Sequence, residues 1–321
     1  MTEENDKPEA GAWERQLVEK LALASVTEAR RKRRWGIFFK LLTFAYLVAI
    51  LAMLMEDDLG DVAKQHKEHT ALVEVKGLIA PDTEASADNI ITGLRDAFKD
   101  KKTKGVILRI NSPGGSAVQA GYVNDEIKRL RNKHKDIPLY AVISDMCASG
   151  GYYIASAADK IYADKASLVG SIGVLMNGFG FVETLEKLGV ERRLLTAGTR
   201  KGFLDPFSPM KEEDAAHVRS LLEDIHQQFI QVVKDGRGDR LKGGDELFSG
   251  LIWTGEQSLK LGLVDELGSS SYVAREVIGV EEIKDYTHEE DVWEKWAKHL
   301  GAGATRALMG MGLFGGSAQL R

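Results

Sequence analysis

Ser149 lies in a setting that can turn a serine hydroxyl into a nucleophile. It follows the strand-like apolar run 139–144 and precedes the helix-like segment 152–155, with Ala148 and Gly150 as its direct neighbours. Small neighbours let a substrate backbone approach the hydroxyl, and a helix start leaves backbone N–H groups without intrahelical partners. Those donors and the positive end of the helix dipole can stabilise an oxyanion. The alternative is that Ser149 only caps the helix.

A second glycine turn follows another apolar run. Residues 105–110 are typical of a buried parallel strand, and they end at 111–116, Asn-Ser-Pro-Gly-Gly-Ser. Gly114 and Gly115 permit positive φ and bring backbone N–H groups to a surface. A helix is predicted over 118–133, with inward side chains at Val118, Tyr122, Ile127 and Leu130. Two such units in succession form a right-handed βαβ arrangement with both turns at the carboxyl edge of the sheet, although either turn alone is equally typical of plain structure.

Lys201 is the candidate for a general base. None of the seven histidines lies in a glycine-flanked or strand-end setting, and each is expected at the surface. Lys201 lies in the glycine-rich turn 198–202, next to Arg200, after a short apolar run. A lysine becomes a base only when burial or a neighbouring cation lowers its pKa; a solvated surface lysine is the alternative. No His-Glu-X-X-His or Cys-X-X-Cys pattern occurs, so neither a metal nor another cofactor is expected.

Four segments together resemble the bacterial signal peptide peptidase A (protease IV) family, peptidase family S49. They are residues 111–115, 148–153, 169–174 and 198–201, in the order and at the spacing of that family. The resemblance extends over about residues 72–268. It implies an α/β fold of the ClpP/crotonase type, a superhelix of repeated ββα units, and a serine protease that uses a Ser–Lys dyad to hydrolyse peptide bonds.

The resemblance also assigns roles to individual residues. Ser149 matches the nucleophile and Lys201 the general base of the dyad. Gly115 and the N–H of Gly150 match the oxyanion donors, and the sequence leaves open whether Gly114 contributes instead. In this scheme the lysine takes the proton of the serine, the alkoxide attacks a peptide carbonyl, and water completes the cycle on the acyl-enzyme.

Three further residues lie in or next to the same segments. Ser171, in the glycine-flanked segment before the lysine, is assigned a hydrogen bond to the amine of Lys201, and a strand-edge hydroxyl is the alternative. An aromatic residue often precedes the lysine in this family, whereas Arg200 stands here. Cys147, the sole cysteine, is a rival nucleophile close to Ser149, but a small core residue is the favoured interpretation, and it cannot form an internal disulfide.

A membrane anchor is predicted near the N-terminus. Residues 30–34 are all basic and precede the apolar run 35–55, which only Lys40 interrupts and which is about 30 Å long as a helix. Lys40 can snorkel, so a single-pass span is favoured over a buried core helix. The positive-inside rule places residues 1–34, with an amphipathic helix over 13–30, in the cytoplasm. No small-residue cleavage site follows, so an uncleaved signal-anchor is expected.

The remaining chain divides into a charged stalk, a protease domain and a tail. The stalk is predicted over 56–70, the domain over 71–285 and a tail without packed elements over 286–321. Within the domain, helices are predicted over 86–100 and 211–234. The net charge is −5 and the basic residues gather beside the anchor, which argues against nucleic-acid binding. The domain would lie outside the inner membrane, in the periplasm of a two-membrane bacterium.

One copy of each motif is present, as in the short members of the family that the chain resembles. Those members need several copies to finish their sites, with serine and lysine from adjacent subunits. The resemblance therefore implies a homo-oligomeric ring whose lumen faces the membrane and receives extended apolar peptides such as cleaved signal peptides. Side chains near Tyr152, Phe179 and Phe203 are expected to line that interior.

Three rival functions remain at this level. A periplasmic peptidase of the SohB type shares the anchor and the dyad and would act on other substrates. A crotonase-like enzyme would use the paired glycine amides to hold an acyl-CoA enolate, although no carboxylate stands at these turns. A non-catalytic membrane scaffold would keep the fold without the reaction.

Overall fold

The computed structural model describes residues 10–64 and 67–288, and within the first range it leaves out some side chains, those of residues 51–64 among them. The chain divides into two compact units, Met1–Lys67 and Glu68–Arg321, and each is described by itself. The first residues of the predicted cytoplasmic segment and nearly all of the predicted tail lie outside the described residues.

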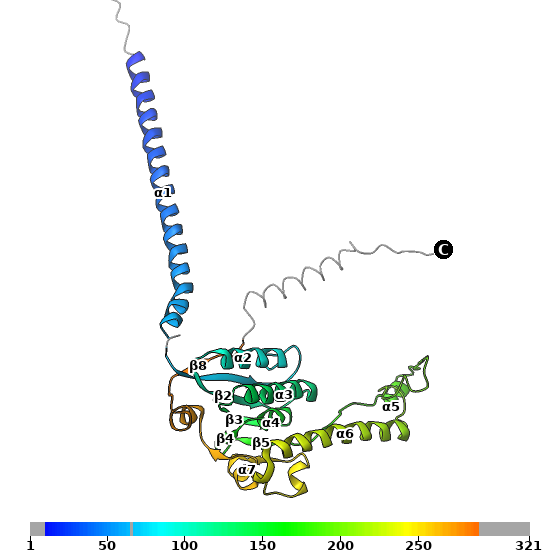
Figure 1. Ribbon diagram of the computed structural model, residues 1–321. Helices are drawn as coiled ribbons and strands as arrows, with labels where there is room; N and C mark the ends of the chain where they lie inside the picture. The colour runs from blue at the N-terminus through cyan, green and yellow to red at the C-terminus, as the bar shows by residue number, and fades with distance from the viewer. Residues whose placement is uncertain (1–9, 65–66, 289–321) are drawn as a thin grey trace, which may run out of the picture. The chain divides into compact units, whose positions relative to one another are not determined.

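The first unit contains one long helix, α1 (Ala10–Lys64), drawn as an unbroken ribbon in Figure 1. It runs through the segments predicted as an amphipathic helix, a membrane span and a stalk. Large apolar side chains are exposed along it from Trp35 to Ile50. Within the described residues, none of the helices has the length and mean hydropathy that crossing a membrane requires. Residues 51–55, the end of the predicted span, have side chains outside the described ones.

The second unit is built on a mixed sheet in which the central strands are parallel. The strands are β1 (His69–Lys76), β2 (Thr103–Ser112), β3 (Leu139–Ala148), β4 (Lys160–Ala163), β5 (Leu168–Gly170), β6 (Ile252–Thr254), β7 (Glu266–Leu267) and β8 (Ile283–Asp285). Their order is β6-β5-β3-β2-β1-β8, with β4 beside β3 and β7 beside β4. Among the described strands, only β5 and β6 pair antiparallel. The predicted α/β class is confirmed.

Helices cover this sheet on both faces. The helices that the structure describes in this unit are α2 (Ala87–Lys99), α3 (Ala117–Lys133), α4 (Gly150–Ala155), α5 (Val182–Lys187), α6 (Glu212–Arg237), α7 (Gly255–Leu261) and α8 (Ser270–Tyr272), with 3-10 turns at Gly238–Arg240 and Asp245–Phe248 and a π-helical turn at Val273–Ile278; α5 lies away from the sheet. The hydroxyls of Ser86 and Ser116 accept the amide N–H groups that open α2 and α3. Both helices therefore begin within two residues of the predicted positions.

Alternating side chains of the central strands pack against the two helical layers. Val106 and Leu108 of β2 belong to the larger core, with α2, α3 and α4, whereas Ile107 faces Val273 and the π-helical turn. A parallel strand buried on both faces reads as a continuous apolar run because neither side meets water. This explains why the sequence predicted β2 and β3 without an alternating pattern.

β3 changes its partner halfway along its length. It pairs with β4 through Tyr140–Ile143 and with β5 through Met146–Ala148. At the same place the register with β2 shifts, and Ser112 comes opposite Cys147. The ends of β2 and β3, and the glycine turns that follow them, therefore lie together at the carboxyl edge of the sheet, as the sequence predicted.

Several predicted inward side chains are exposed. Val118 and Tyr122 are 60% and 58% exposed, because α3 buries the stripe that contains Ala120 and Val123, and two positions along a helix is 200° around its axis. In α6, Phe229 is buried but Leu221 is exposed, since the body covers only the C-terminal half of this helix. The prediction for His69 is wrong in the opposite sense, because the sequence placed this residue at the surface and the structure buries it.

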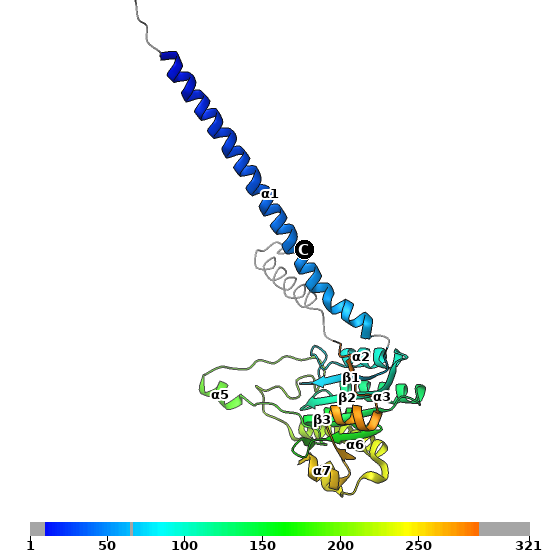
Figure 2. The same cartoon turned by 90° about the vertical axis from the view of Figure 1, so that its left-hand side faces the viewer.

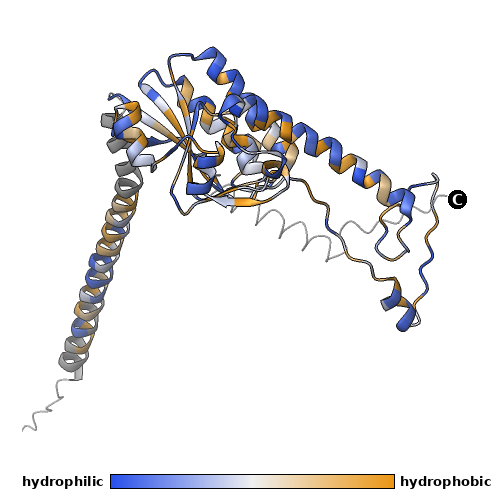
Figure 3. Cartoon of the chain, turned by 90° about the horizontal axis from the view of Figure 1, so that it is seen from below, coloured by the Kyte–Doolittle hydropathy of each residue, from blue (hydrophilic) through white to orange (hydrophobic). Residues whose placement is uncertain are grey.

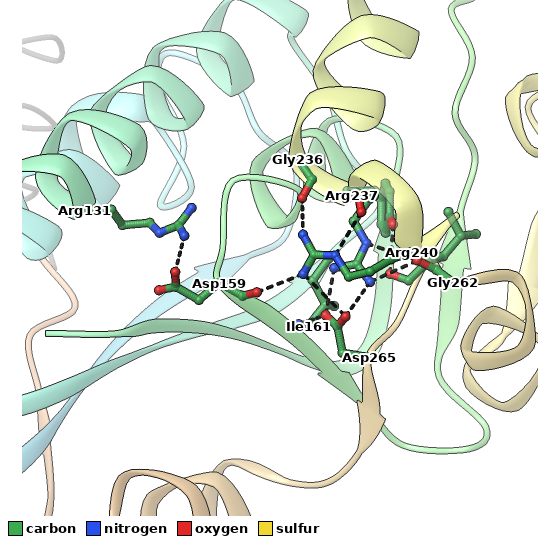
Figure 4. A network of polar contacts seen from close by, with 10 residues as sticks. Arg131, Asp159, Ile161, Gly236, Arg237, Arg240, Gly262 and Asp265 are labelled. Atoms are coloured by element: carbon green, nitrogen blue, oxygen red, sulfur yellow. Dashed lines mark hydrogen bonds and ion pairs between the residues drawn. The ribbon is translucent and has the colours of Figure 1, made fainter. Parts of the chain in front are cut away.

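The C-terminal end of α6 is fixed to the body by a buried arginine (Figure 4). Arg237 is fully buried, and its guanidinium donates to both carboxylate oxygens of Asp265, at 2.7 and 2.9 Å. It also donates twice to the carbonyl of Gly262. Asp265 accepts in addition from the amide of Ile161 at the start of β4. One ion pair therefore ties α6, the sheet and the loop before β7 together.

Removing the carboxylate of this pair should strongly destabilise the fold. Asp265→Ala leaves Arg237 charged and buried without its partner, which costs about 3–5 kcal/mol. Denaturant unfolding followed by circular dichroism measures the loss. The matched control is Glu276→Ala, which breaks the half-exposed pair with Arg275 and should change the free energy of unfolding by less than about 1 kcal/mol. Equal, small effects of both substitutions would contradict the assignment.

The same pair should make stability depend on pH. Burial alone would raise the pKa of Asp265, but the hydrogen bonds and charge of Arg237 outweigh it, and the pKa lies below its ordinary value. A carboxyl whose pKa is lower in the folded state stabilises the fold above the unfolded pKa of about 3.9, and this contribution disappears as the pH falls through the folded pKa. Below about pH 4 the wild type should therefore lose stability more steeply than Asp265→Asn in parallel urea titrations.

Candidate active site

The turn that carries Ser149 is strained. It joins β3 to α4. Ser149 has φ +51° and ψ −120°, a backbone conformation that residues other than glycine rarely adopt. Two backbone hydrogen bonds hold it: its N–H donates to the carbonyl of Gly170 at 2.8 Å, and its carbonyl accepts from Tyr153 at 2.9 Å. The hydroxyl makes no capping bond to α4. The helix-cap interpretation is therefore wrong, and the side chain is left for another purpose.

Gly114 lies directly against this turn. A Cβ on Gly114 would stand 2.7 Å from the amide nitrogen of Gly150, 2.7 Å from the Cβ of Ser149 and 2.8 Å from the carbonyl oxygen of Ala148. Its φ is +100°. Any side chain at position 114 would displace the serine turn, so the two glycine turns form one packed unit.

Two backbone amides are available beside the serine. The N–H of Gly114 is occupied, because it donates to the hydroxyl of Ser112 at 3.1 Å, and that hydroxyl donates to the carbonyl of Gly77. Among the described residues, no acceptor is present for the N–H of Gly115, which lies 3.3 Å from where a Cβ of Gly150 would stand. Gly150 opens α4, so its N–H has no intrahelical partner. The geometry thus favours Gly115 over Gly114 as the donor beside Gly150.

Ser112 is the residue that the sequence did not single out. It is buried, and its hydroxyl holds the glycine turn in place. Because this hydroxyl accepts the N–H of Gly114, that amide is not available to an oxyanion. The only signal was its place at the end of β2, before Pro113. Its role therefore becomes visible only once the turn has folded.

Ser171 lies next to the serine turn, one residue beyond the Gly170 carbonyl that Ser149 uses. It too has a positive φ, +54°, and its N–H donates to the carbonyl of Leu251 at 2.7 Å. The following Ile172 carbonyl contacts the ring of His226 on α6 at 3.2 Å. Ser171 is therefore held at the same edge as Ser149, and it is partly exposed.

Lys201 does not lie at this edge within one chain. It belongs to a segment that we call the arm, residues 174–211, in which α5 is the one helix that the structure describes. Next to Lys201, Arg200 pairs with Glu213 and Asp214 in the first turn of α6. The body contacts α6 from His226 onward, which is 12 residues or about 18 Å beyond Asp214 along the helix. Figures 1 and 2 both show α5 well away from the sheet.

The arm encloses a cavity of about 1270 Å³ with the first turns of α6. Arg192 of its wall pairs with Asp205 and lies over the ring of Phe207. Many apolar side chains of the arm remain exposed, and the largest fractions belong to Leu175 (82%), Phe179 (76%), Met210 (72%), Leu188 (70%) and Leu195 (96%). Figure 3 shows this mixture of hydrophobic and hydrophilic residues along the arm and α6. The arm thus leaves many of its apolar side chains outside any hydrophobic core.

Two other predicted residues are placed in the core. Cys147 is fully buried, and burial raises the pKa of its thiol, so it is a core residue rather than a rival nucleophile. Tyr152 itself is also fully buried and donates its hydroxyl to the carbonyl of Leu263, so its own side chain belongs to the core. Phe179 and Phe203 are exposed on the arm. Within the described residues no cluster of three or more metal-binding side chains occurs.

Comparison with known proteins places the chain among the peptidases. The model of the family described as "Peptidase family S49" matches residues 131–283, a range that includes Ser149, Ser171 and Lys201. A protein of Synechocystis sp. named "Putative protease slr0021" is 34% identical over 203 residues, which cover 63% of this chain and 71% of that protein. The chain belongs to peptidase family S49.

Two longer relatives share only part of their length with this chain. The protein of Enterococcus faecium named "Putative signal peptide peptidase SppA" is 34% identical over 206 residues, 62% of this chain and 59% of that protein. A Brucella abortus protein named "Na(+)/H(+) antiporter NhaA" is 46% identical over 186 residues, 58% of this chain but 25% of that protein. The chain thus spans a quarter to under two thirds of these relatives.

Proposed function

We propose that this chain is a serine endopeptidase with Ser149 as its nucleophile and Lys201 of a neighbouring copy as its general base. The observation that carries the proposal is the strained Ser149 turn, packed on Gly114 and flanked by the amides of Gly115 and Gly150. Strain of this kind persists at sites where it holds a reactive group in place. The family's peptidase activity supports the same reaction.

The reaction proceeds by acyl transfer. Lys201 takes the proton of the Ser149 hydroxyl, and the oxygen attacks a peptide carbonyl to form a tetrahedral oxyanion. The N–H groups of Gly115 and Gly150 stabilise this charge, a contribution worth about 10²–10³ in rate for each such donor. The protonated lysine then gives its proton to the leaving amine, and water repeats the sequence on the acyl-enzyme. Ser171 accepts a hydrogen bond from the lysine amine and orients it.

A second copy is needed because one chain separates the two halves of the dyad. The arm holds Lys201 beyond the first turn of α6, away from its own Ser149. The exposed apolar side chains of the arm need a surface to cover them, and the body offers Leu78, Val118 and Tyr122, all exposed, beside the Gly115 turn. An arm that packs there on the next copy brings its lysine to that copy's serine. Repetition of this heterologous contact produces a ring.

The substrates are extended apolar peptides at a membrane surface, such as cleaved signal peptides. The name of the Enterococcus relative agrees with this substrate class. The exposed apolar side chains from Trp35 to Ile50, after five basic residues, support a single-pass anchor with a cytoplasmic N-terminus and the peptidase unit outside the inner membrane. The partner switch of β3 supports the superhelical ClpP/crotonase-type fold.

A fluorophosphonate serine probe tests the proposal directly. The wild type should be labelled at Ser149, and the tryptic peptide that contains the label identifies the residue. Labelling should disappear in Ser149→Ala and fall at least about a hundredfold in Lys201→Ala, because the hydroxyl then lacks its base. Lys187→Ala, an exposed lysine of the same arm, is the control and should be labelled like the wild type. Labelling of Ser149 that does not depend on Lys201 would overturn the dyad.

A further inference from the structure

Lysines gather at the edge of the sheet opposite to Ser149. Because β1, β2, β3 and β4 are parallel, their first residues share the amino edge. The turns that enter these strands, the C-terminal half of α3 and the start of β4 together carry six lysines, which we call the lysine edge: Lys101, Lys102, Lys128, Lys133, Lys135 and Lys160. All except the half-buried Lys128 are exposed, and in the described part of the chain none of the six forms an ion pair.

A hollow of about 540 Å³ opens in the middle of this edge. Lys128, Lys135 and Lys160 line it together with Arg131 and His134. Its carboxylate, Asp159, is already occupied by Arg131 and by the amide of Leu139.

The guanidinium of Arg131 has one N–H group without a partner in the described part of the chain. Its Nε–H is buried and has no hydrogen-bond partner among the described residues. Elsewhere on the same edge, Glu68 and Asp100 are paired with Lys104 and Lys284, whereas the exposed Asp136, next to Lys135, has no ion pair among the described residues. The hollow therefore combines concentrated positive charge with a described lining whose carboxylate is already paired, which is the chemistry of a phosphate-type anion site.

We propose that the lysine edge binds the anionic phosphate headgroups of the membrane in which the chain is anchored, an inference that rests on the anchoring proposed above. The chain itself points to this occupant. The predicted span ends at residue 55, fourteen residues before β1 begins at His69, so the amino edge is the edge at which the chain from the anchor enters the sheet. A short tether keeps the lysines at high effective concentration near the headgroups, and each lysine near an anionic surface gains roughly fivefold in binding.

Lysine acetylation read out by mass spectrometry tests this on the full-length chain. The protein is reconstituted in vesicles of phosphatidylcholine, with or without phosphatidylglycerol, and treated with an uncharged acetylating reagent. With phosphatidylglycerol, acetylation of Lys101, Lys102 and Lys133 should fall at least roughly fivefold. Lys76 and Lys165, exposed at the carboxyl edge, are internal controls and should not change. High salt should restore the acetylation, because the Debye length falls from about 10 Å at 0.1 M to about 3 Å at 1 M.

A variant and two further readings decide the outcome. The variant carries four substitutions together, Lys101→Gln, Lys102→Gln, Lys133→Gln and Lys135→Gln. In this variant the protection of Lys128 and Lys160 from acetylation should be lost, while flotation with phosphatidylcholine vesicles is unchanged. Equal acetylation in both vesicles, with the protein floating in each, overturns the lysine edge and leaves the anchor intact. Failure to float overturns the anchor and this inference together. Equal protection by soluble glycerol phosphate in phosphatidylcholine vesicles overturns the lipid as the source of the anion.

Discussion

Mixed assemblies of Ser149→Ala and Lys201→Ala chains should recover peptidase activity that neither variant has alone. In the proposed assembly each site takes its serine from one copy and its lysine from the next, so a site works when the first copy is Lys201→Ala and its neighbour is Ser149→Ala. Random mixing gives that arrangement at about a quarter of the sites in a heterologous ring. The two chains are co-expressed with different tags, purified by both tags and assayed on an apolar reporter peptide.

The control uses chains that cannot complement each other. Ser149→Ala mixed with the double variant Ser149→Ala, Lys201→Ala has no intact serine and should stay inactive at the same assembly size. If the first mixture also stays inactive while sedimentation shows mixed oligomers, the shared site is wrong. The dyad would then have to form within one chain, through a movement of the arm towards its own Ser149.

The sequence was sufficient to predict those parts of the fold that depend on residues close together in the chain. The apolar runs of β2 and β3 are continuous because both faces are buried, and the glycine turns after them need positive φ at Gly114 and Gly115. Parallel pairing then places both turns at one edge. These features depend on residues close in the chain, so local patterns alone predict where Ser149 and its neighbouring amides lie.

Other features depend on contacts that no local pattern encodes. The apolar stripe of α6 looks like that of a buried helix, yet Leu221 is exposed because the body ends before it reaches that turn. The surroundings of Lys201 could not be predicted either, since the arm has one short helix and little periodicity. Nor does a sequence reveal that Ser149 adopts φ +51° or that Ser112 claims the Gly114 amide. The backbone conformation of Ser149 and the bond between Gly114 and Ser112 are the two features that distinguish a reactive serine from an ordinary helix cap.

The contact between the two glycine turns leads to the second large effect. Gly114→Ala should lower peptidase activity at least about a hundredfold, because a displacement of about 1 Å in a catalytic group costs about 10² in rate. The new methyl group would stand 2.7 Å from both the Gly150 amide and the Cβ of Ser149, so it has to push the nucleophile away from its oxyanion donors. The positive φ of +100° adds about 1–3 kcal/mol of strain. Activity and serine-probe labelling, each with a thermal melt, measure the effect.

Gly121→Ala provides the matched control, because it makes the same chemical change on the next helix. A Cβ at position 121 meets no atom within 4 Å, and alanine inside α3 is a better helix former by about 1 kcal/mol. This variant should keep wild-type activity and melt at the same temperature or slightly higher. The decisive pattern is an inactive Gly114→Ala that still folds beside an active Gly121→Ala. A folded Gly114→Ala that retains activity within about threefold of the wild type would mean that the Gly114 turn does not position Ser149, because a displacement of about 1 Å costs about a hundredfold.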